Sequence, residues 1–484
     1  MRSIRKLKTY YIKTYGCQMN YSDSERIETI LRRAALHAAP NMKTADVIIF
    51  NTCSVRQSAE DRILGMCNNI KKLKEKRNDK LPITILTGCM AQRNERQKAQ
   101  GSKQNIKYFK MLKKKVPWVD IILPIKDIER LPKLLTMQLC NYANKKTDNS
   151  KYLSIKPKYT SNYKAYVPIS TGCNEFCAYC VVPFARGKLI NRPANEIIDE
   201  VKTLVKRGYK DIMLLGQNVD AWRSQSSTHS LVQTSMSEPH NFLSLLKAVD
   251  SIPGDFWLSF LSSHPNYFTN DLIEYFFKST NACTMRSGDR ILPGGHIRPY
   301  INLALQSGSN KILKRMNRKY TIEEFINICS QLKSHCPQLN LSTDIIVGFP
   351  GETEKDFQKT VDVMERLEFD MAYINKYSPR EGTAAAKLKD DVPWNVKKRR
   401  AEELNDILRK TALKNNRKYL GKKVKVLVEK VDEKNKVAFG KMHNFKDIRI
   451  SPLASHSSLP QKGKFILVNV TKVNAWCLEG EVIE

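Results

Sequence analysis

Short apolar runs of strand length, each followed by a stretch of helix length, recur along most of this 484-residue chain. In the first part they occupy 10–15, 46–51 and 83–87, with the sequences YYIKTY, DVIIFN and ITILT. Repeated strand–helix units form parallel sheets with right-handed crossovers, which places the carboxyl ends of the strands along one edge. The pattern therefore predicts an α/β protein that begins with a parallel-sheet domain over residues 8–140.

A second set of six strand-length runs lies further along the chain. These runs are YVPIS, DIMLLG, FWLSFL, INLAL, STDIIVG and AYINKY, between residues 166 and 377. Six such units predict a partial (β/α)6 barrel of TIM type over 159–411, with its reactive centre at the carboxyl ends of the strands. The polar, Lys-rich segment 141–165 is predicted to be a linker, and 223–240 a surface loop.

The last part of the chain has a different pattern. KVKVLVEK (423–430) and KFILVNVTKV (464–473) alternate apolar with charged residues, which is typical of strands with one buried face. This predicts a small antiparallel β-barrel, OB-like, or an antiparallel sheet over 415–483. A chain of 484 residues is long enough for three domains of roughly 150 residues each.

Charge narrows the choice of partners. The chain has 82 Lys and Arg against 48 Asp and Glu, a net charge of +34, and 413–484 alone has fifteen against seven. Such an excess favours a polyanion such as nucleic acid, because bound cations release counterions from phosphates. The alternative is a Lys-rich composition inherited from an AT-rich genome.

No apolar run approaches the ~18 residues that cross a bilayer, and the basic N-terminal segment has no apolar stretch of signal-peptide length. We therefore expect a cytoplasmic protein with no membrane partner. Disulfides are rare in that compartment, so the twelve cysteines need another explanation.

Three cysteines follow the strand YVPIS in the pattern CxxxCxxC: Cys173, Cys177 and Cys180. Soft thiolates in a tight loop suit zinc or an iron–sulfur cluster. Structural zinc normally takes a fourth ligand, and the nearby sequence offers none. Three thiolates on a four-iron cluster would leave one iron open to a small molecule. The alternative is three buried or zinc-bound cysteines.

A second set of three cysteines follows the first three strands. Cys17, Cys53 and Cys89 are each 36 residues from the next, and Gly16 and Gly88 allow close backbone approach. Their common position after parallel strands predicts that they converge in space at a second cluster site. Scattered buried thiols are the alternative.

Polar residues and one glycine mark the ends of the barrel strands. Gln217 and Asn218 follow the second strand, Gln306 follows the fourth, and Asp344 and Gly348 lie on the fifth. We expect these five positions to bind the small-molecule cofactor that the open iron would hold. Structural caps and turns are the alternative.

Four more residues near the predicted centre carry open interpretations. His264, in Ser-Ser-His-Pro, is either a proton relay or a hydrogen-bonding residue of a strand end. Arg186, Lys188 and Arg192 follow the CxxxCxxC loop. They either steer a phosphate or neutralise a cofactor carboxylate, or form a solvated face.

Eight segments together resemble the methylthiotransferase family of radical S-adenosylmethionine (SAM) enzymes, nearly from end to end. They are YGCQMNYSDSERI, FNTCSVRQSAEDRILG, GCMAQR, GCNEFCAYCVVPFARG, LLGQNVDAW, SSHP, LQSGSNKILKRMNRKYT and STDIIVGFPGETEKDF. Within the family, the tetrads at 181–184 and 216–219 are most similar to the branch that modifies isopentenylated adenosine in tRNA.

The resemblance implies two [4Fe-4S] clusters, an auxiliary one on Cys17, Cys53 and Cys89 and a radical one on the CxxxCxxC cysteines. It implies that one SAM methylates sulfur and a second yields the 5′-deoxyadenosyl radical, so that carbon 2 of isopentenyladenosine next to the anticodon receives a methylthio group. It also implies a C-terminal RNA-binding TRAM barrel, a flavodoxin- or ferredoxin-type electron donor and a sulfur donor. We expect a monomer, and no catalytic residue is assigned beyond the cluster ligands.

Two other functions stay open on the sequence. The same chemistry could act on threonylcarbamoyladenosine in tRNA or on a ribosomal-protein aspartate. A non-catalytic iron–sulfur protein that binds RNA is the third possibility.

Overall fold

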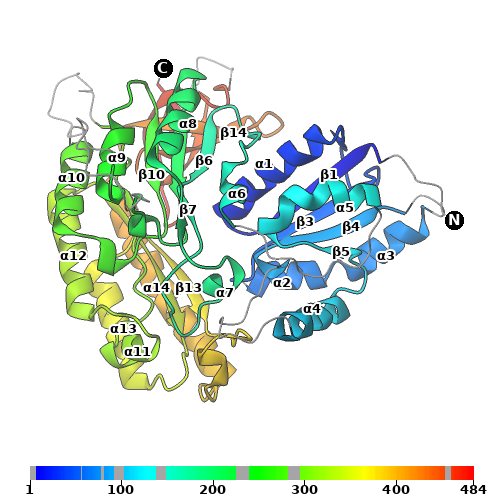
Figure 1. Ribbon diagram of the computed structural model, residues 1–484. Helices are drawn as coiled ribbons and strands as arrows, with labels where there is room; N and C mark the ends of the chain where they lie inside the picture. The colour runs from blue at the N-terminus through cyan, green and yellow to red at the C-terminus, as the bar shows by residue number, and fades with distance from the viewer. Residues whose placement is uncertain are drawn as a thin grey trace, which may run out of the picture.

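A computed structural model describes residues 7–55, 57–77, 81–91, 103–137, 149–224, 239–281, 295–452 and 459–483. Figure 1 shows an N-terminal sheet with its helices beside a larger central array of strands and helices, and a C-terminal barrel packed against that array. The predicted α/β fold with these three parts is confirmed.

The N-terminal sheet has five parallel strands in the order β2-β1-β3-β4-β5. Its three long strands are β1 (Thr9–Tyr15), β3 (Val47–Thr52) and β4 (Ile83–Gly88), at the predicted positions. The short edge strands are β2 (His37–Ala38) and β5 (Ile121–Ile122). In-register pairing of β1, β3 and β4 brings the residues after these strands to one edge.

Helices cover both faces of this sheet. One face packs against α1 (Gln18–Arg33), the 3-10 segment η2 (Ile125–Arg130) and α5 (Leu131–Met137). The other packs against α2 (Gln57–Leu64), α3 (Cys67–Glu75) and α4 (Lys103–Lys115). The residues after β3 form two helices, α2 and α3, which are separated by a break at 65–66. Val55 is exposed, although it lies at helical spacing from the buried Ala59 and Ile63.

Part of the predicted linker is ordered. Residues Asn149–Ser154 form α6, and Tyr152, Leu153 and Ile155 are buried in the core beside α1 and α5. The segment is polar on average, but these apolar side chains bury enough surface to dock it. The prediction of a linker over 141–165 is therefore wrong for this part, and 141–148 lies outside the described residues.

The central part contains the predicted open barrel. Strands β6 (Lys164–Pro168), β9 (Asp211–Leu215) and β10 (Trp257–Phe260) form one parallel sheet. Strands β11 (Tyr300–Asn302), β12 (Asn340–Val347) and β13 (Met371–Lys376) form the other. Single parallel bridges, Leu258 with Ile297 and Ser263 with Leu303, join the two. Among the described residues β13 does not pair with β6, so the barrel is open.

Helices cover the outside of this array (Figure 1). They are α8 (Ala194–Lys206), α9 (Phe242–Asp250), α10 (Asn270–Asn281), α12 (Ile322–His335), α13 (Glu354–Leu367) and α14 (Trp394–Arg417). On β9, Ile212 and Leu214 pack toward these helices, whereas Met213 and Leu215 face the N-terminal part. Most of the predicted loop at 223–240 lies outside the described residues.

The C-terminal part is a closed five-stranded barrel in the order β14-β15-β16-β18-β17. Its strands are β14 (Lys423–Asp432), β15 (Val437–Met442), β16 (Asp447–Ser451), β17 (Phe465–Val473) and β18 (Leu478–Val482). The predicted antiparallel arrangement holds except between β16 and β18, which pair in parallel and close the barrel.

Arg298 joins this barrel to the central array. Its guanidinium donates to the carbonyl oxygens of His443 (2.8 Å) and Met442 (2.6 Å) and to Asp211 Oδ1 (3.1 Å). The same group lies over the ring of Phe445, 3.6 Å from its centroid. The turn after β15 is therefore buried against the central array.

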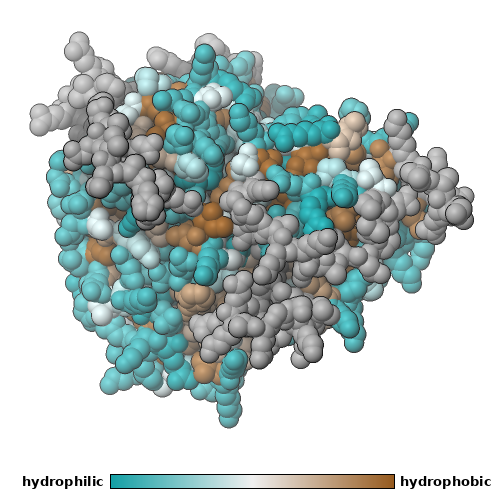
Figure 2. Space-filling view, viewed as in Figure 1, coloured by the Kyte–Doolittle hydropathy of each residue, from teal (hydrophilic) through white to brown (hydrophobic). Residues whose placement is uncertain are grey.

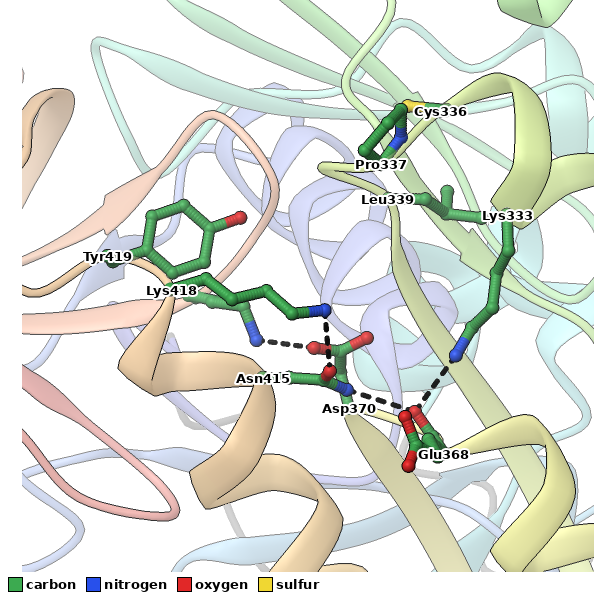
Figure 3. A pocket seen from close by; sticks show the side chains of 10 residues that line it. Lys333, Cys336, Pro337, Leu339, Glu368, Asp370, Asn415, Lys418 and Tyr419 are labelled. Carbon is green, nitrogen blue, oxygen red and sulfur yellow. Dashed lines mark hydrogen bonds and ion pairs between the residues drawn. The ribbon is translucent and has the colours of Figure 1, made fainter.

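A cavity of about 300 Å³ lies at the same junction (Figure 3). Its cationic groups already have partners: Lys446 pairs with Asp370 at 2.6 Å, Lys418 donates to Asn415 Oδ1 at 3.1 Å, and Lys333 donates to the Glu368 carbonyl at 3.1 Å. The cavity therefore lies between the two parts and is lined by polar groups that already bind one another.

Hydrophilic side chains dominate the face seen in Figure 2, as the charge composition leads one to expect. Across the described ranges, no helix is both long and apolar enough to span a membrane.

Candidate active site at the domain boundary

The residue before the CxxxCxxC loop is a glycine, and any other residue there would be strained. Gly172 follows β7 (Ser170–Thr171) with φ +78°, and a Cβ atom there would lie 2.1 Å from the carbonyl oxygen of Lys188. The tight packing lets the Cys173 N–H donate to the Gly187 carbonyl at 3.1 Å. The loop is thus folded back on the segment that follows it.

Contacts from three other places pin the loop to the barrel. The Tyr267 hydroxyl donates to Glu175 Oε1 at 2.7 Å, and Asn317 Nδ2 donates to the Phe176 carbonyl at 2.8 Å. The Ala178 N–H donates to the Met316 carbonyl at 2.8 Å. The loop is therefore held in one geometry by groups outside it.

Each of the three sulfurs in this loop accepts an N–H donor. Arg318 Nη1 lies 3.4 Å from Cys177 Sγ, and the backbone N–H groups of Glu175 and Val182 point at Cys173 Sγ and Cys180 Sγ, both at 3.4 Å. Burial raises the pKa of Cys173 to about 11 and also raises the pKa of Cys180. These donors would stabilise thiolates when a metal centre replaces the protons.

The second triad lies at the edge of the N-terminal sheet. Cys17 precedes α1, Cys53 follows β3, and Cys89 begins the 3-10 turn η1 (Cys89–Ala91) after β4. A hydrogen bond with Cys53 and the positive charge of Arg186 lower the pKa of Cys17 to about 6, although burial opposes them. Burial raises the pKa of Cys89, which Cys17 raises further. The structure brings these three thiols together.

Two glycines permit this convergence. A Cβ atom at Gly16 would lie 2.2 Å from Asn20 Oδ1, and one at Gly88 would lie 2.4 Å from Asn51 Oδ1. These two asparagines bond to each other at 3.1 Å, and Cys17 Sγ lies 3.5 Å from Asn20 Oδ1. The close backbone approach predicted at these glycines is confirmed at Gly88, where a Cβ atom would also lie 2.5 Å from the Thr52 carbonyl oxygen, whereas at Gly16 the close neighbour is the Asn20 side chain.

The two triads lie on the same side of the barrel. Cys17 and Met19 pack with Met213, Leu215 and Leu261, at the carboxyl ends of β9 and β10. The short helix α7 (Val182–Ala185), directly after the CxxxCxxC loop, packs against η1. The N-terminal triad therefore faces the end of the barrel that carries the other triad.

Two of the three basic residues after the loop are buried and paired. Arg186 donates to Cys89 Sγ at 3.2 Å and pairs with Asp23 at 2.6 Å. Arg192 pairs with Glu200 at 2.7 Å, and Lys188 is exposed. Of the alternatives left open, a solvated face does not hold for either arginine, because protein carboxylates compensate their charges inside the fold.

The five residues predicted at strand ends lie where expected. Gln217 is half-buried, and Asn218 is buried after β9. Gln306 has φ +66°, a strained conformation for a side chain of this type. Asp344 accepts a bond from Asn302 at 3.2 Å, and Gly348 donates its N–H to Glu352 at 2.6 Å. Contact of these residues with a cofactor stays a prediction.

Within the described part of the chain, five buried polar atoms at this end of the barrel have no hydrogen-bond partner. They are Ser170 Oγ, Asn218 Oδ1, Asp220 Oδ1, Ser263 Oγ and His264 Nε2. Buried polar groups are usually paired, so several unpaired ones at the ends of neighbouring strands fit a site for a polar ligand.

His264 and Asp220 form part of this group. His264 Nδ1 accepts the Asn266 N–H at 3.2 Å, and burial lowers the pKa of the ring to about 3. Burial raises the pKa of Asp220 to about 8, and its Oδ2 accepts the His264 N–H at 2.9 Å. The structure supports the interpretation of His264 as a hydrogen-bonding residue of a strand end.

Comparison with known proteins agrees with this geometry. Residues 9–109 match the uncharacterized protein family UPF0004, and 167–364 match the radical SAM superfamily. A curated tRNA-2-methylthio-N(6)-dimethylallyladenosine synthase from Clostridium novyi (strain NT) is 37% identical over 98% of this chain and 97% of its own length. The synthase of that name from Thermoanaerobacter sp. (strain X514) is 37% identical over 98% of this chain and 93% of its own.

The chain belongs to the methylthiotransferase family of radical SAM enzymes. Among solved structures, TsrM, a radical SAM methyltransferase from Kitasatospora setae, is 12% identical, with a TM-score of 0.49 over 79% of this chain and 77% of that chain. A likeness so distant says nothing about substrate.

Enzymes of this family use [4Fe-4S] clusters and SAM, and the residues of this methylthiotransferase fit them. Across the described ranges no three His, Cys, Asp or Glu side chains are placed to hold a single metal ion. In a four-iron cluster each cysteine binds its own iron, so the sulfurs lie farther apart than around one ion. Buried thiols with N–H donors, beside unpaired polar atoms, are the donor set that a cluster and a polar cofactor require.

Sequence reasoning missed several residues of this site. Arg318, Asp23 and Asp220 are buried and contact the site or its neighbours, but their positions show no motif spacing. Asp220 lies two residues after Asn218, so its place after a barrel strand is the one signal that could have found it. Arg318 and Asp23 are brought in by tertiary packing.

Proposed function

We propose that this methylthiotransferase is a tRNA-2-methylthio-N(6)-dimethylallyladenosine synthase, which places a methylthio group on carbon 2 of isopentenyladenosine next to the anticodon. The single observation that supports this best is the packing of the N-terminal triad against the barrel end that carries the CxxxCxxC loop. Two relatives with that printed name match the chain over nearly its whole length.

In this proposal Cys17, Cys53 and Cys89 hold the auxiliary cluster, and the CxxxCxxC cysteines hold the radical cluster. When bound, the clusters and SAM supply sulfur methylation and the radical that removes the hydrogen of carbon 2. An aromatic C–H is too weak an acid for a side-chain base, so the protein's own contribution is positioning and exclusion of water.

The chain's own residues explain how that positioning is achieved. The loop is fixed by Glu175 with Tyr267 and by Phe176 with Asn317, both of which are contacts within the protein. We propose that Gln217, Asn218, Gln306, Asp344 and Gly348 contact SAM, together with the unpaired atoms at the same end of the barrel. Asp220 lies among them: burial raises its pKa to about 8, and its unpaired Oδ1 is available for a hydrogen bond to this ligand.

The C-terminal barrel supports a tRNA partner. Residues 413–484 have a net charge of +8, and lysines on its strands and turns are exposed. Exposed ones include Lys422, Lys423, Lys434, Lys436 and Lys464. Exposed cations can contact phosphates without regard to base sequence. This suits a C-terminal domain that holds the tRNA while the target base enters the open barrel of the central part.

Nucleoside analysis of tRNA from a deletion strain tests the proposal. We expect 2-methylthio-isopentenyladenosine to disappear and isopentenyladenosine to accumulate. The wild-type gene should restore the product, and genes with Cys53→Ala or Cys177→Ala should not. An unchanged 2-methylthio-isopentenyladenosine peak would contradict the proposal. Loss of the threonylcarbamoyl derivative or of the ribosomal-aspartate modification instead would reassign the substrate.

We further propose a cytoplasmic monomer that receives electrons from a flavodoxin- or ferredoxin-type protein and sulfur from a separate donor. Sedimentation of the tRNA-free enzyme tests the oligomeric state. Cofactor cleavage supported by each candidate reductant tests the electron donor.

A further inference from the structure

One short helix contacts a cysteine of each triad. The N–H of Val182, the first residue of α7, donates to Cys180 Sγ at 3.4 Å. Arg186, the residue after α7, donates its Nε to Cys89 Sγ at 3.2 Å. A helix rises ~1.5 Å per residue, so these two residues are separated by only about 6 Å along its axis. A single turn of helix therefore links the two sites.

The Arg186 side chain is held in place by the N-terminal part. It is 1% exposed, and its two Nη atoms lie 2.6 and 3.4 Å from the two carboxylate oxygens of Asp23 on α1. Asp23 also accepts the hydroxyl of Tyr152 on α6. A buried ion pair contributes little net stability after desolvation, but a two-point contact fixes the direction of the guanidinium.

We propose that Arg186 is a positioning residue of the auxiliary site, whose guanidinium, oriented by Asp23, donates to the Cys89 sulfur and thereby sets the reduction potential of the cluster held there. The inference rests on the proposed assignment of Cys17, Cys53 and Cys89 to a cluster. The proposal gives Arg186, which belongs to the central part of the chain, a role at the metal site of the N-terminal part.

The direction of the effect follows from charge. Reduction adds a negative charge to a cluster, and a cationic N–H donor to a ligand sulfur stabilises the more negative state. Hydrogen bonds to the sulfurs and local net charge are known determinants of cluster potential. Removal of the guanidinium should therefore make the auxiliary cluster harder to reduce.

The test isolates the auxiliary cluster in the full-length chain. The reference variant carries Cys173→Ala, Cys177→Ala and Cys180→Ala, is reconstituted anaerobically, and is titrated with reductant while its reduced cluster is followed by electron paramagnetic resonance. With Arg186→Gln added, we expect the ratio of reduced to oxidised cluster at a fixed potential to fall about tenfold. For a one-electron couple this is a shift of about 59 mV to lower potential.

A matched control separates this effect from loosened domain contact. Arg380 also crosses the boundary: it pairs with Glu60 at 3.1 Å and donates to the Val55 carbonyl at 3.1 Å, and neither partner is a sulfur. Arg380 reaches the auxiliary site only through Val55, whose N–H donates to Cys53 Sγ at 3.2 Å, so Arg380→Gln should shift the potential much less than Arg186→Gln. Because Arg186→Gln leaves Asp23 buried without its cationic partner, the double variant Asp23→Asn/Arg186→Gln removes both charges. It should shift the potential in the same direction but by less, because the nearby negative charge is lost as well.

Each result decides the matter. A shift in both Arg186 variants that exceeds any shift in Arg380→Gln supports the proposal. An unchanged potential in the double variant, or an equal shift with Arg380→Gln, overturns it. Loss of iron from the double variant alone would mean that Arg186 is needed to hold the cluster, and would overturn the effect on potential. If the reference variant itself binds no iron, the cluster assignment under the proposed function fails, which the iron assay shows before any titration.

Discussion

Replacing Gly172 by alanine should disable one metal site and leave the other intact. The residue has φ +78°, and an added Cβ would lie 2.1 Å from the Lys188 carbonyl oxygen and 2.6 Å from that of Gly187. Real Cβ atoms essentially never come closer than 3.0 Å to a neighbour. The contact is with backbone, so the loop or the segment 187–188 must move by about 0.9 Å.

The magnitude follows from these distances. The left-handed conformation costs an alanine roughly 1–2 kcal/mol, and the clash adds a displacement of the residue next to Cys173. Misplacement by ~1 Å can reduce a reaction that depends on positioning by about 100-fold. We therefore expect Gly172→Ala to cleave SAM at least ~100-fold more slowly and to bind about four irons rather than about eight.

Gly208→Ala is the matched control. Gly208 has φ +83°, and a Cβ there would meet nothing within 4 Å. It carries the same conformational cost without the clash, so its iron content and cleavage rate should equal those of the wild type. The assay is iron per chain and 5′-deoxyadenosine production after anaerobic reconstitution. Wild-type values in Gly172→Ala, or equal losses in both variants, would refute the reasoning.

Three further changes have expected outcomes. Burial raises the pKa of Glu25 to about 7 from an ordinary value near 4.5, so the folded chain keeps a proton that the unfolded chain loses, and this group should lower stability by at most ~3.4 kcal/mol as pH rises from 4.5 to 7. Glu25→Gln should reduce the slope in urea unfolding without abolishing it, because burial also raises the pKa values of Asp220 and Glu352; an unchanged slope would contradict this. Arg298→Met should destabilise the barrel junction by about 3–5 kcal/mol, seen as faster amide exchange at 442–446, and unchanged exchange would contradict it. Arg318→Gln removes the donor to Cys177 and should slow SAM cleavage while the N-terminal triad keeps its iron; full cleavage would refute a role for this contact.

Local periodicity explains why so much of the fold could be predicted. Strand-length apolar runs followed by helical spacing identify β1, β3 and β4, and the parallel pairing of these strands brings Cys17, Cys53 and Cys89 to one edge. The same reasoning located the barrel strands and the CxxxCxxC loop. These features depend on residues that are near in sequence, or on a topology with few alternatives.

Contacts between distant residues could not be predicted in this way. Arg186 and Cys89 are 97 residues apart, and Arg318 and Cys177 are 141 apart. No spacing rule brings them together, because domain packing decides which buried cation faces which sulfur. The parallel pairing of β16 with β18 was missed for the same reason, since alternation identifies a strand but not its neighbour.

Iron content in three versions of the full-length enzyme tests the central claim most directly. After anaerobic reconstitution the wild type should bind about eight irons per chain, and Cys53→Ala and Cys177→Ala about four each. The iron left in Cys53→Ala should support SAM cleavage, and that left in Cys177→Ala should not. About four irons in the wild type, or an undiminished eight in either variant, would contradict two clusters held by the two cysteine triads.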